Sequence, residues 1–131
     1  MHATSNFEVE SWDESPIFGE NDGSKVTRAV VSKSFEGDIA GKGTVEWLMG
    51  YRADGTASFV GLERIIGRVG ERAGSFVLQH VGEFDGQVAK GTLTVVPGSG
   101  TEDLTDLTGE GSFEAGMGAD GARNVELDYD V

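Results

Sequence analysis

Cysteine is absent from the 131-residue chain, so the protein has neither disulfide bonds nor thiolate metal ligands. Proline occurs only twice, and the 21 glycines follow no Gly-X-Y period, which argues against collagen-like and proline-rich disordered proteins. No apolar run is long enough to span a bilayer as a helix. The N-terminal MHATSNFEVE also lacks the basic-then-apolar order of a signal peptide. We therefore expect a cytoplasmic protein with no membrane partner.

Basic residues are scarce: 10 lysines and arginines stand against 23 acidic residues, for a net charge of −13. Nucleic acids and anionic membranes are themselves polyanions, so this charge argues against both as partners. His2 and His80 are too few for a zinc site, and acidic segments such as EDLTD lack the EF-hand spacing. The glycine-rich PGSGT lacks the helix and the lysine of a phosphate-binding loop, and we interpret it as a loop at the mouth of a barrel. The sequence thus predicts no cofactor and no metal.

Short runs of alternating apolar and polar residues dominate the chain, and no stretch keeps a helical spacing. Turns are predicted at ADGT (53–56), GERA (70–73), FDGQ (84–87) and MGADGA (117–122). An irregular insert at 97–111 is expected to be held to the body by Leu104 and Leu107. Strands are predicted at 5–13, 26–36, 43–52, 56–69, 73–84, 87–97, 109–115 and 123–130.

Eight strands joined mostly by hairpins predict an all-β protein. The expected fold is a single eight-stranded antiparallel up-and-down β-barrel domain over residues 1–131, with a β-sandwich as the alternative.

The GERA turn determines which residues oppose each other across the central hairpin. A loop of two or four residues centred on Glu71 and Arg72 places Glu63 opposite His80. A loop of three or five residues would instead place Gln79 opposite Glu63 and turn His80 outward. We predict the first arrangement, because its inward face is apolar apart from Glu63 and His80.

The neighbouring hairpins predict the same interior. A three-residue loop within RADGT pairs Trp47 with Gly61, and a two-residue turn at DG (85–86) pairs His80 with Gly91. The strand at 26–36 stays ambiguous, because neither of its faces is cleanly apolar. The predicted interior comprises Trp47, Met49, Tyr51, Phe59, Gly61, Glu63, Ile65, Phe76, Leu78, His80, Phe84, Ala89, Gly91, Leu93 and Val95, with Phe113, Leu127 and Tyr129 added by the final hairpin.

Glu63 and His80 are the candidate catalytic residues. Directly opposed residues have Cβ atoms about 5 Å apart, so a carboxylate–imidazole hydrogen bond is within reach. Burial disfavours each charge while the partner favours both, which suits general acid–base chemistry. The alternative is a structural pair in which two buried polar groups satisfy each other.

Aromatic and apolar residues of the same interior are the candidate ligand-binding residues. They are Trp47, Met49, Tyr51, Phe59, Phe76, Leu78, Phe84 and Tyr129. We expect Gly61 and Gly91 to leave space for a small cavity beside them. The alternatives are that these glycines serve the bends of a closing barrel and that the aromatic residues simply fill the core.

The outer face of the predicted sheet is unusually apolar. Its outward residues include Leu48, Val60, Leu62, Ile66, Val77, Val81 and Val88. Such a patch is larger than a soluble monomer usually exposes, so we expect a homo-oligomer.

Several segments resemble the bacterial domain-of-unknown-function family DUF3224. They are LMGYRADGTASFVGLERIIGRVGERAGSFVLQHVGEF and TLTVVPGSGTEDLTDLTGEGSFE, with FEVESWDESP near the start and LDYDV at the end, so the resemblance covers nearly the whole chain. The family is similar in fold to the allene oxide cyclase type of barrel, which implies eight antiparallel strands around an interior cavity. Relatives of that fold include cyclases of polyunsaturated substrates and spirocyclases, but this is an analogy of fold, and no activity or catalytic residue comes with the family.

The sequence therefore predicts a β-barrel that binds a small apolar molecule in an aromatic-lined cavity. If the protein is an enzyme, the expected class is a cofactor-independent isomerase, cyclase or lyase, with Glu63 as base or acid and His80 as its partner. The alternatives are a non-catalytic ligand carrier or sensor, and a structural homo-oligomer with a filled barrel.

Overall fold

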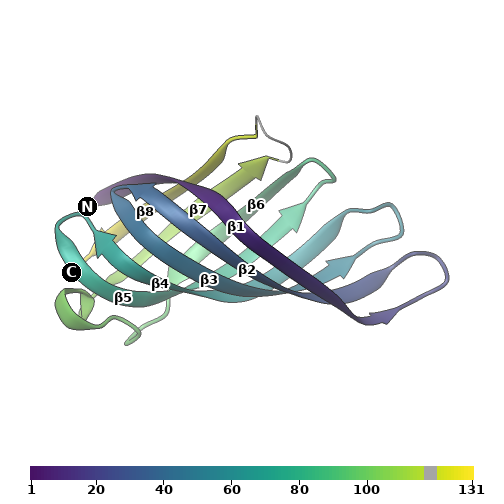
Figure 1. The fold of residues 1–131 in the computed structure, drawn as a ribbon, viewed down its shortest axis with the longest axis horizontal. Helices are drawn as coiled ribbons and strands as arrows, with labels where there is room; N and C mark the ends of the chain where they lie inside the picture. Colours follow the sequence, from purple (N-terminus) through teal and green to yellow (C-terminus); the bar gives the residue numbers. More distant parts are fainter. Residues whose placement is uncertain (117–120) are drawn as a thin grey trace.

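The computed structural model describes residues 1–116 and 121–131, in which every strand runs antiparallel to its neighbour in chain order (Figure 1). β1 also pairs with β8, so the eight strands close into a barrel. The predicted all-β, up-and-down barrel is thereby confirmed, while residues 117–120 of the predicted turn MGADGA lie outside the described residues. The elements are β1 (His2–Gly19), β2 (Lys25–Gly37), β3 (Ile39–Tyr51), β4 (Ala57–Val69), β5 (Arg72–Phe84), β6 (Val88–Val95), the short 3-10 helix η1 (Glu102–Leu104), β7 (Thr108–Gly116) and β8 (Arg123–Asp130).

β3 illustrates why these segments form strands around one core. Val45 and Trp47 are buried, whereas Glu46 and Leu48 beside them are exposed. Successive side chains of a strand point to opposite faces, so every second residue of β3 fills the barrel.

The inward face of β2 cannot be recognised from its sequence alone. Its inward residues are Thr27, Ala29, Val31, Lys33 and Phe35, all of them buried. Two of these five are polar, which explains why neither face of this strand looks cleanly apolar in the sequence. The structure thus resolves the ambiguity in favour of the face that carries Lys33.

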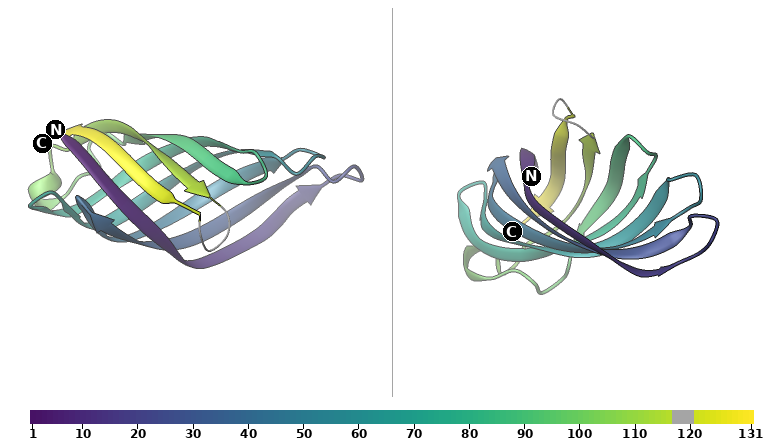
Figure 2. Two further views of the ribbon diagram at one scale, coloured as in Figure 1. Left: turned by 90° about the horizontal axis from the view of Figure 1, so that it is seen from above. Right: turned by 45° about the vertical axis from the view of Figure 1, so that its right-hand side comes forward.

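β1 departs from regular pairing. It pairs with β8 only through residues 2–6 but with β2 along almost its whole length. A register shift at Glu10 forms a β-bulge, after which Trp12 and Glu14 lie across from the inward-facing residues of β2. Residues 14–19, which the sequence leaves outside the first strand, continue β1 into a β1–β2 hairpin that extends beyond the other hairpins (Figure 2).

The β4–β5 hairpin turns one residue earlier than predicted. Its two loop residues are Gly70 and Glu71, because Gly70 adopts a positive φ of 60° that glycine tolerates and Val69 pairs with Arg72. The predicted direct pairing of Glu63 with His80 is therefore wrong: Glu63 pairs with Leu78 and His80 with Gly61.

The β5–β6 hairpin turns one residue later than predicted. Gly86, at φ 99°, and Gln87 form its tip, because the Asp85 carboxylate accepts hydrogen bonds from the backbone N–H groups of Gln87 and Val88. His80 consequently pairs with Leu93 rather than with Gly91.

The β3–β4 register, with Trp47 opposite Gly61, is as predicted. The errors in the other two hairpins each shift the register by two residues. Because side chains alternate with a period of two, the predicted faces survive. The inward residues predicted from these hairpins are buried or packed against the core, and Leu127 and Phe113 of the final hairpin are buried as well.

The insert between β6 and β7 closes one end of the barrel. Leu104 and Leu107 are fully or almost fully buried in the core, which confirms that they hold this insert to the body. Thr101 lies against the start of β5, where its hydroxyl accepts a hydrogen bond from the backbone N–H of Ser75. PGSGT (97–101) therefore lies at the closed end, and its interpretation as a mouth loop is wrong.

Candidate functional site

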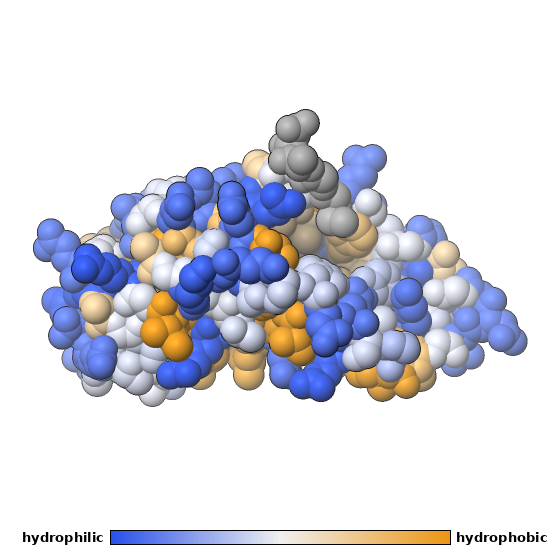
Figure 3. Space-filling model, in the orientation of Figure 1, coloured by the Kyte–Doolittle hydropathy of each residue, from blue (hydrophilic) through white to orange (hydrophobic). Residues whose placement is uncertain are grey.

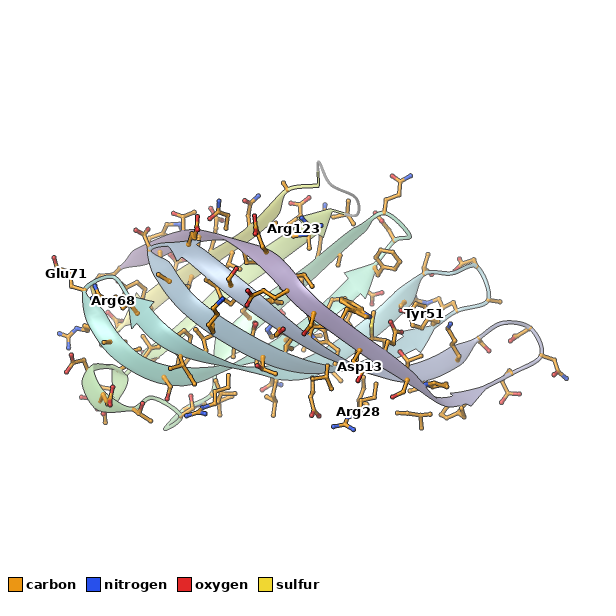
Figure 4. All side chains as sticks on the ribbon, viewed as in Figure 1. Asp13, Arg28, Tyr51, Arg68, Glu71 and Arg123 are labelled. Atoms are coloured by element: carbon orange, nitrogen blue, oxygen red, sulfur yellow. The ribbon has the colours of Figure 1, made fainter. Side chains whose placement is uncertain are left out.

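A cavity of about 460 Å³ opens at the other end of the barrel, where the β3–β4, β5–β6 and β7–β8 hairpins lie. Tyr51 of β3 and Arg123 of β8 both border it (Figure 4). Residues from all eight strands line the cavity: Phe7, Val9, Trp12, Glu14, Lys33, Trp47, Met49, Tyr51, Phe59, Phe84, Ala89, Phe113, Ala115, Gly116 and Arg123.

The predicted ligand-binding residues divide between this cavity and the packed core. Those that border the cavity are Trp47, Met49, Tyr51, Phe59 and Phe84. Phe76 and Leu78 lie instead in the core, where they are fully or almost fully buried. Tyr129 lies toward the closed end, with its hydroxyl beside Gly70 of the β4–β5 turn.

Gly61 and Gly91 do not provide the space expected of them. A Cβ atom at Gly91 would lie 2.4 Å from Cε1 of Phe113, and one at Gly61 would lie 2.5 Å from Cδ1 of Trp47. The rings of Phe113 and Trp47 fill the space beside these glycines. The cavity is real, but it lies above these rings and is walled by them.

Lys33 is a site residue that was not predicted from the sequence. Its side chain is 2% exposed, borders the cavity, and has its Nζ over the rings of Phe7, Trp47 and Phe113 at 4.6, 5.0 and 5.7 Å from their centroids. Aromatic faces attract a cation electrostatically, so these rings partly replace the water that the ammonium loses. The β2–β3 register could have identified Lys33. Ala29 pairs with inward-facing Trp47, and Lys33 lies on the same face of β2 as Ala29, so it also points inward.

A chain of polar groups runs from Trp47 to Lys33 below the cavity. Trp47 Nε1–H donates to His80 Nδ1 at 3.3 Å, which makes Nδ1 the acceptor and leaves the proton on Nε2. His80 Nε2–H then donates to Glu63 Oε1 at 2.9 Å. The other carboxylate oxygen, Oε2, lies 3.5 Å from Lys33 Nζ. The structure thus brings Glu63 and His80 together in a hydrogen bond, although neither borders the cavity.

Burial and mutual charge set the protonation of this cluster. Burial alone would raise the pKa of Glu63, but the Lys33 charge and the His80 hydrogen bond outweigh it and hold this pKa below its ordinary value. Burial lowers the pKa of His80 and of Lys33, and Glu63 opposes the shift only in part. Glu63 is therefore a carboxylate, His80 is neutral, and the Lys33 ammonium gives up its proton more readily than a surface lysine does.

Glu14 forms a second polar cluster, at the cavity mouth. Its Oε2 accepts hydrogen bonds from the hydroxyls of Thr27 at 2.6 Å and Tyr51 at 2.9 Å, and its Oε1 accepts one from Trp12 Nε1 at 2.9 Å. Partial burial, reinforced by the bond to Glu14, raises the pKa of Tyr51 to about 12. Trp12 and Glu14 could not be predicted as site residues, because only the bulge at Glu10 turns them to this side.

The outward apolar residues gather on neighbouring strands. Leu48, Val60 and Val81 pair in a row across β3, β4 and β5, and each is 50% exposed. Leu62 and Ile66 are also exposed, whereas Val77 and Val88 are half-buried. Figure 3 shows hydrophobic patches set among hydrophilic residues on one face of the molecule.

The other histidine, His2, does not line the cavity. His2 Nδ1 is 2.6 Å from Oδ1 of Asp128, and both side chains are exposed. In the described part of the chain, no three or more His, Asp or Glu side chains are grouped so as to hold a metal ion. Within residues 1–116 and 121–131, no helix is long and apolar enough to cross a membrane.

Comparison with known proteins identifies relatives but no activity. The family model described as "Protein of unknown function (DUF3224)" matches residues 3–129. The crystal structure of a protein of unknown function from this family, from Shewanella oneidensis MR-1, is similar with a TM-score of 0.82 and 28% sequence identity, over 99% of this chain and 96% of that chain. No curated protein matches the chain. Function must therefore be argued from the cavity and its polar groups.

Proposed function

The chain belongs to the DUF3224 family, and we propose that it binds one small, mostly apolar molecule in the cavity at the open end of its barrel. The observation that carries this proposal is the cavity itself, which is walled by aromatic and aliphatic side chains and holds few polar groups. Its volume of about 460 Å³ lies within the range of about 300–1,000 Å³ that is usual for small-molecule sites. A barrel that is only structural would have no need to leave this space unfilled.

Both tryptophans of the chain, Trp12 and Trp47, border the cavity and report on its occupancy. We expect the uncharged aromatic probe N-phenyl-1-naphthylamine to change the tryptophan emission saturably. Ala89→Leu should weaken this binding, because Ala89 lines the cavity and a larger side chain occupies it. Ala73→Leu is the matched control on the exposed outer face of β5. Absence of saturable binding, or equal weakening by both variants, would refute the proposal.

A second candidate function is catalysis of an isomerisation, cyclisation or elimination without a cofactor. The observation that favours it is the hydrogen bond between Glu63 and His80, whose ionised carboxylate lies beside Lys33 at the cavity wall. In this proposal Glu63 is the acid or base and His80 orients it, while Lys33 carries the proton between Glu63 and the ligand. Glu63→Gln should then abolish turnover while leaving cavity binding largely intact. A non-catalytic carrier or sensor has no turnover to lose, and its ligand binding should tolerate the change.

We also propose that the protein is a homo-oligomer. The row of Leu48, Val60 and Val81 supports this, because it joins exposed apolar side chains across three adjacent strands.

A further inference from the structure

Lys33 differs from the other lysines of the chain in its surroundings. Its side chain is 2% exposed, whereas Lys25, Lys42 and Lys90 are exposed. It also borders the cavity, and its Nζ lies 4.6 Å from the ring centroid of Phe7, another cavity residue. A ligand that fills the cavity therefore lies against a lysine side chain that is shielded from water.

Glu63 is placed to exchange a proton with this amine. One of its oxygens, Oε1, accepts the hydrogen bond from His80 Nε2–H at 2.9 Å, which fixes the carboxylate. Among the described residues, the other oxygen, Oε2, is buried and has no hydrogen-bond partner, and it lies 3.5 Å from Lys33 Nζ. The ion pair with Lys33 offsets only part of the hydration that this buried oxygen loses, because no hydrogen bond satisfies it. A role in moving the proton of Lys33 accounts for it.

We propose that Lys33 forms a Schiff base with an aldehyde or ketone whose apolar body occupies the cavity, an inference that rests on the ligand-binding function proposed above. The apolar walls select a hydrophobic body, and the amine selects a carbonyl group. A desolvated lysine in an apolar pocket is a recognised form of activated amine nucleophile.

The reaction balances with the groups present. Glu63 Oε2 takes a proton from the Lys33 ammonium, and the nitrogen lone pair forms a bond to the carbonyl carbon while the C=O π pair moves to oxygen. The oxygen takes a proton from the nitrogen, which gives a carbinolamine. Glu63 returns its proton to the hydroxyl, which leaves as water as the nitrogen lone pair forms the C=N bond. An ammonium and a carbonyl thus become a protonated imine and water, with Glu63 again a carboxylate and no oxidant or reductant consumed.

The test is reductive trapping with a defined probe. The intact chain is incubated with trans-cinnamaldehyde and sodium cyanoborohydride, and the modified lysine is located by peptide mass spectrometry. We expect labelling of Lys33 to exceed that of exposed Lys42 several-fold. Cinnamyl alcohol, which has the same apolar body but no carbonyl, should suppress this labelling. Lys33→Arg keeps the positive charge and should lose this adduct, while Lys42→Arg should retain it.

The outcomes separate this inference from the proposal on which it rests. If cinnamyl alcohol changes the tryptophan emission saturably but Lys33 is labelled no more than Lys42, the Schiff base is refuted and ligand binding stands. If neither compound binds and Lys33 stays unlabelled, both proposals fail. The comparison of Lys33 with Lys42 is made within the unsubstituted chain, so it decides the question even if Lys33→Arg does not fold.

Discussion

Glu63 and His80 form a hydrogen bond of 2.9 Å between adjacent strands although they are not directly opposite each other. His80 lies opposite Gly61, whose missing side chain leaves room for the ring of Trp47, and Trp47 in turn donates to His80 Nδ1. The imidazole is therefore held at both nitrogens, and Glu63 receives the Nε2 proton. This arrangement links the cavity wall to the buried carboxylate through a neutral histidine.

The pKa values of the two histidines should be shifted in opposite directions. Burial lowers the pKa of His80 below its ordinary value of 6.5, whereas the hydrogen bond to Asp128 raises that of exposed His2 above it. NMR of the imidazole carbons and nitrogens should show His80 neutral, with the proton on Nε2, at a pH where His2 is already largely protonated. A His80 that titrates as an ordinary exposed histidine would contradict the buried chain of hydrogen bonds.

Acid should destabilise the fold through the same groups. The folded-state pKa values of His80 and Glu63 both lie below their unfolded values of 6.5 and 4.5, so below each unfolded value the unfolded chain binds more protons than the folded one. Stability should therefore fall as the pH drops below about 6.5, and more steeply below about 4.5. Urea titrations over this range measure it. In Glu63→Gln the steeper loss below about 4.5 should be reduced, and an unchanged profile would show that Glu63 does not contribute.

Removal of the Glu63 charge should be costly because it leaves Lys33 as a buried, unpaired cation. We expect Glu63→Gln to lower the free energy of unfolding by about 3–5 kcal/mol, measured by urea denaturation. Glu46→Gln is the matched control, since Glu46 pairs with Arg28 on the exposed outer surface, and it should change stability little. The double variant Glu63→Gln, Lys33→Met should recover much of the loss. A double variant no more stable than Glu63→Gln would mean that Lys33 is not the source of the penalty.

The faces of the strands could be predicted because alternation has a period of two, and both hairpin errors were shifts of two residues. Glu63 and His80 were therefore placed inside correctly even though their pairing was wrong. Lys33 was missed because an inward lysine breaks the alternation that reveals a face, and only a cross-strand register exposes it. Trp12 and Glu14 were missed because a β-bulge reverses the alternation with no mark in the sequence. The position of the cavity depends on how the rings of Trp47 and Phe113 pack, which no pattern of residue types specifies.

Gly91 should be intolerant of even a methyl group. A Cβ atom there would lie 2.4 Å from the Phe113 ring, so Gly91→Ala must displace a side chain that walls the cavity. Overpacking of this kind costs about 1–3 kcal/mol in the free energy of unfolding. Gly50→Ala is the matched control, because a Cβ atom there meets nothing closer than 3.7 Å. Equal stability of the two variants in thermal or urea denaturation would show that the space beside Gly91 is not filled.

The apolar row on β3, β4 and β5 should be covered in solution by a second copy of the chain. Val60 lies at its centre, between Leu48 and Val81, and each of the three is 50% exposed. Multi-angle light scattering should give a mass above 13.8 kDa at tens of micromolar, and Val60→Lys should shift the protein toward the monomer, because a lysine charge is costly to bury in an apolar contact. Ser112→Lys adds the same charge at an exposed position of β7, outside the row, and should leave the assembly unchanged. A monomeric parent protein would contradict this prediction. Equal dissociation by both variants would mean that the added charge, rather than the position of Val60, disrupts the assembly.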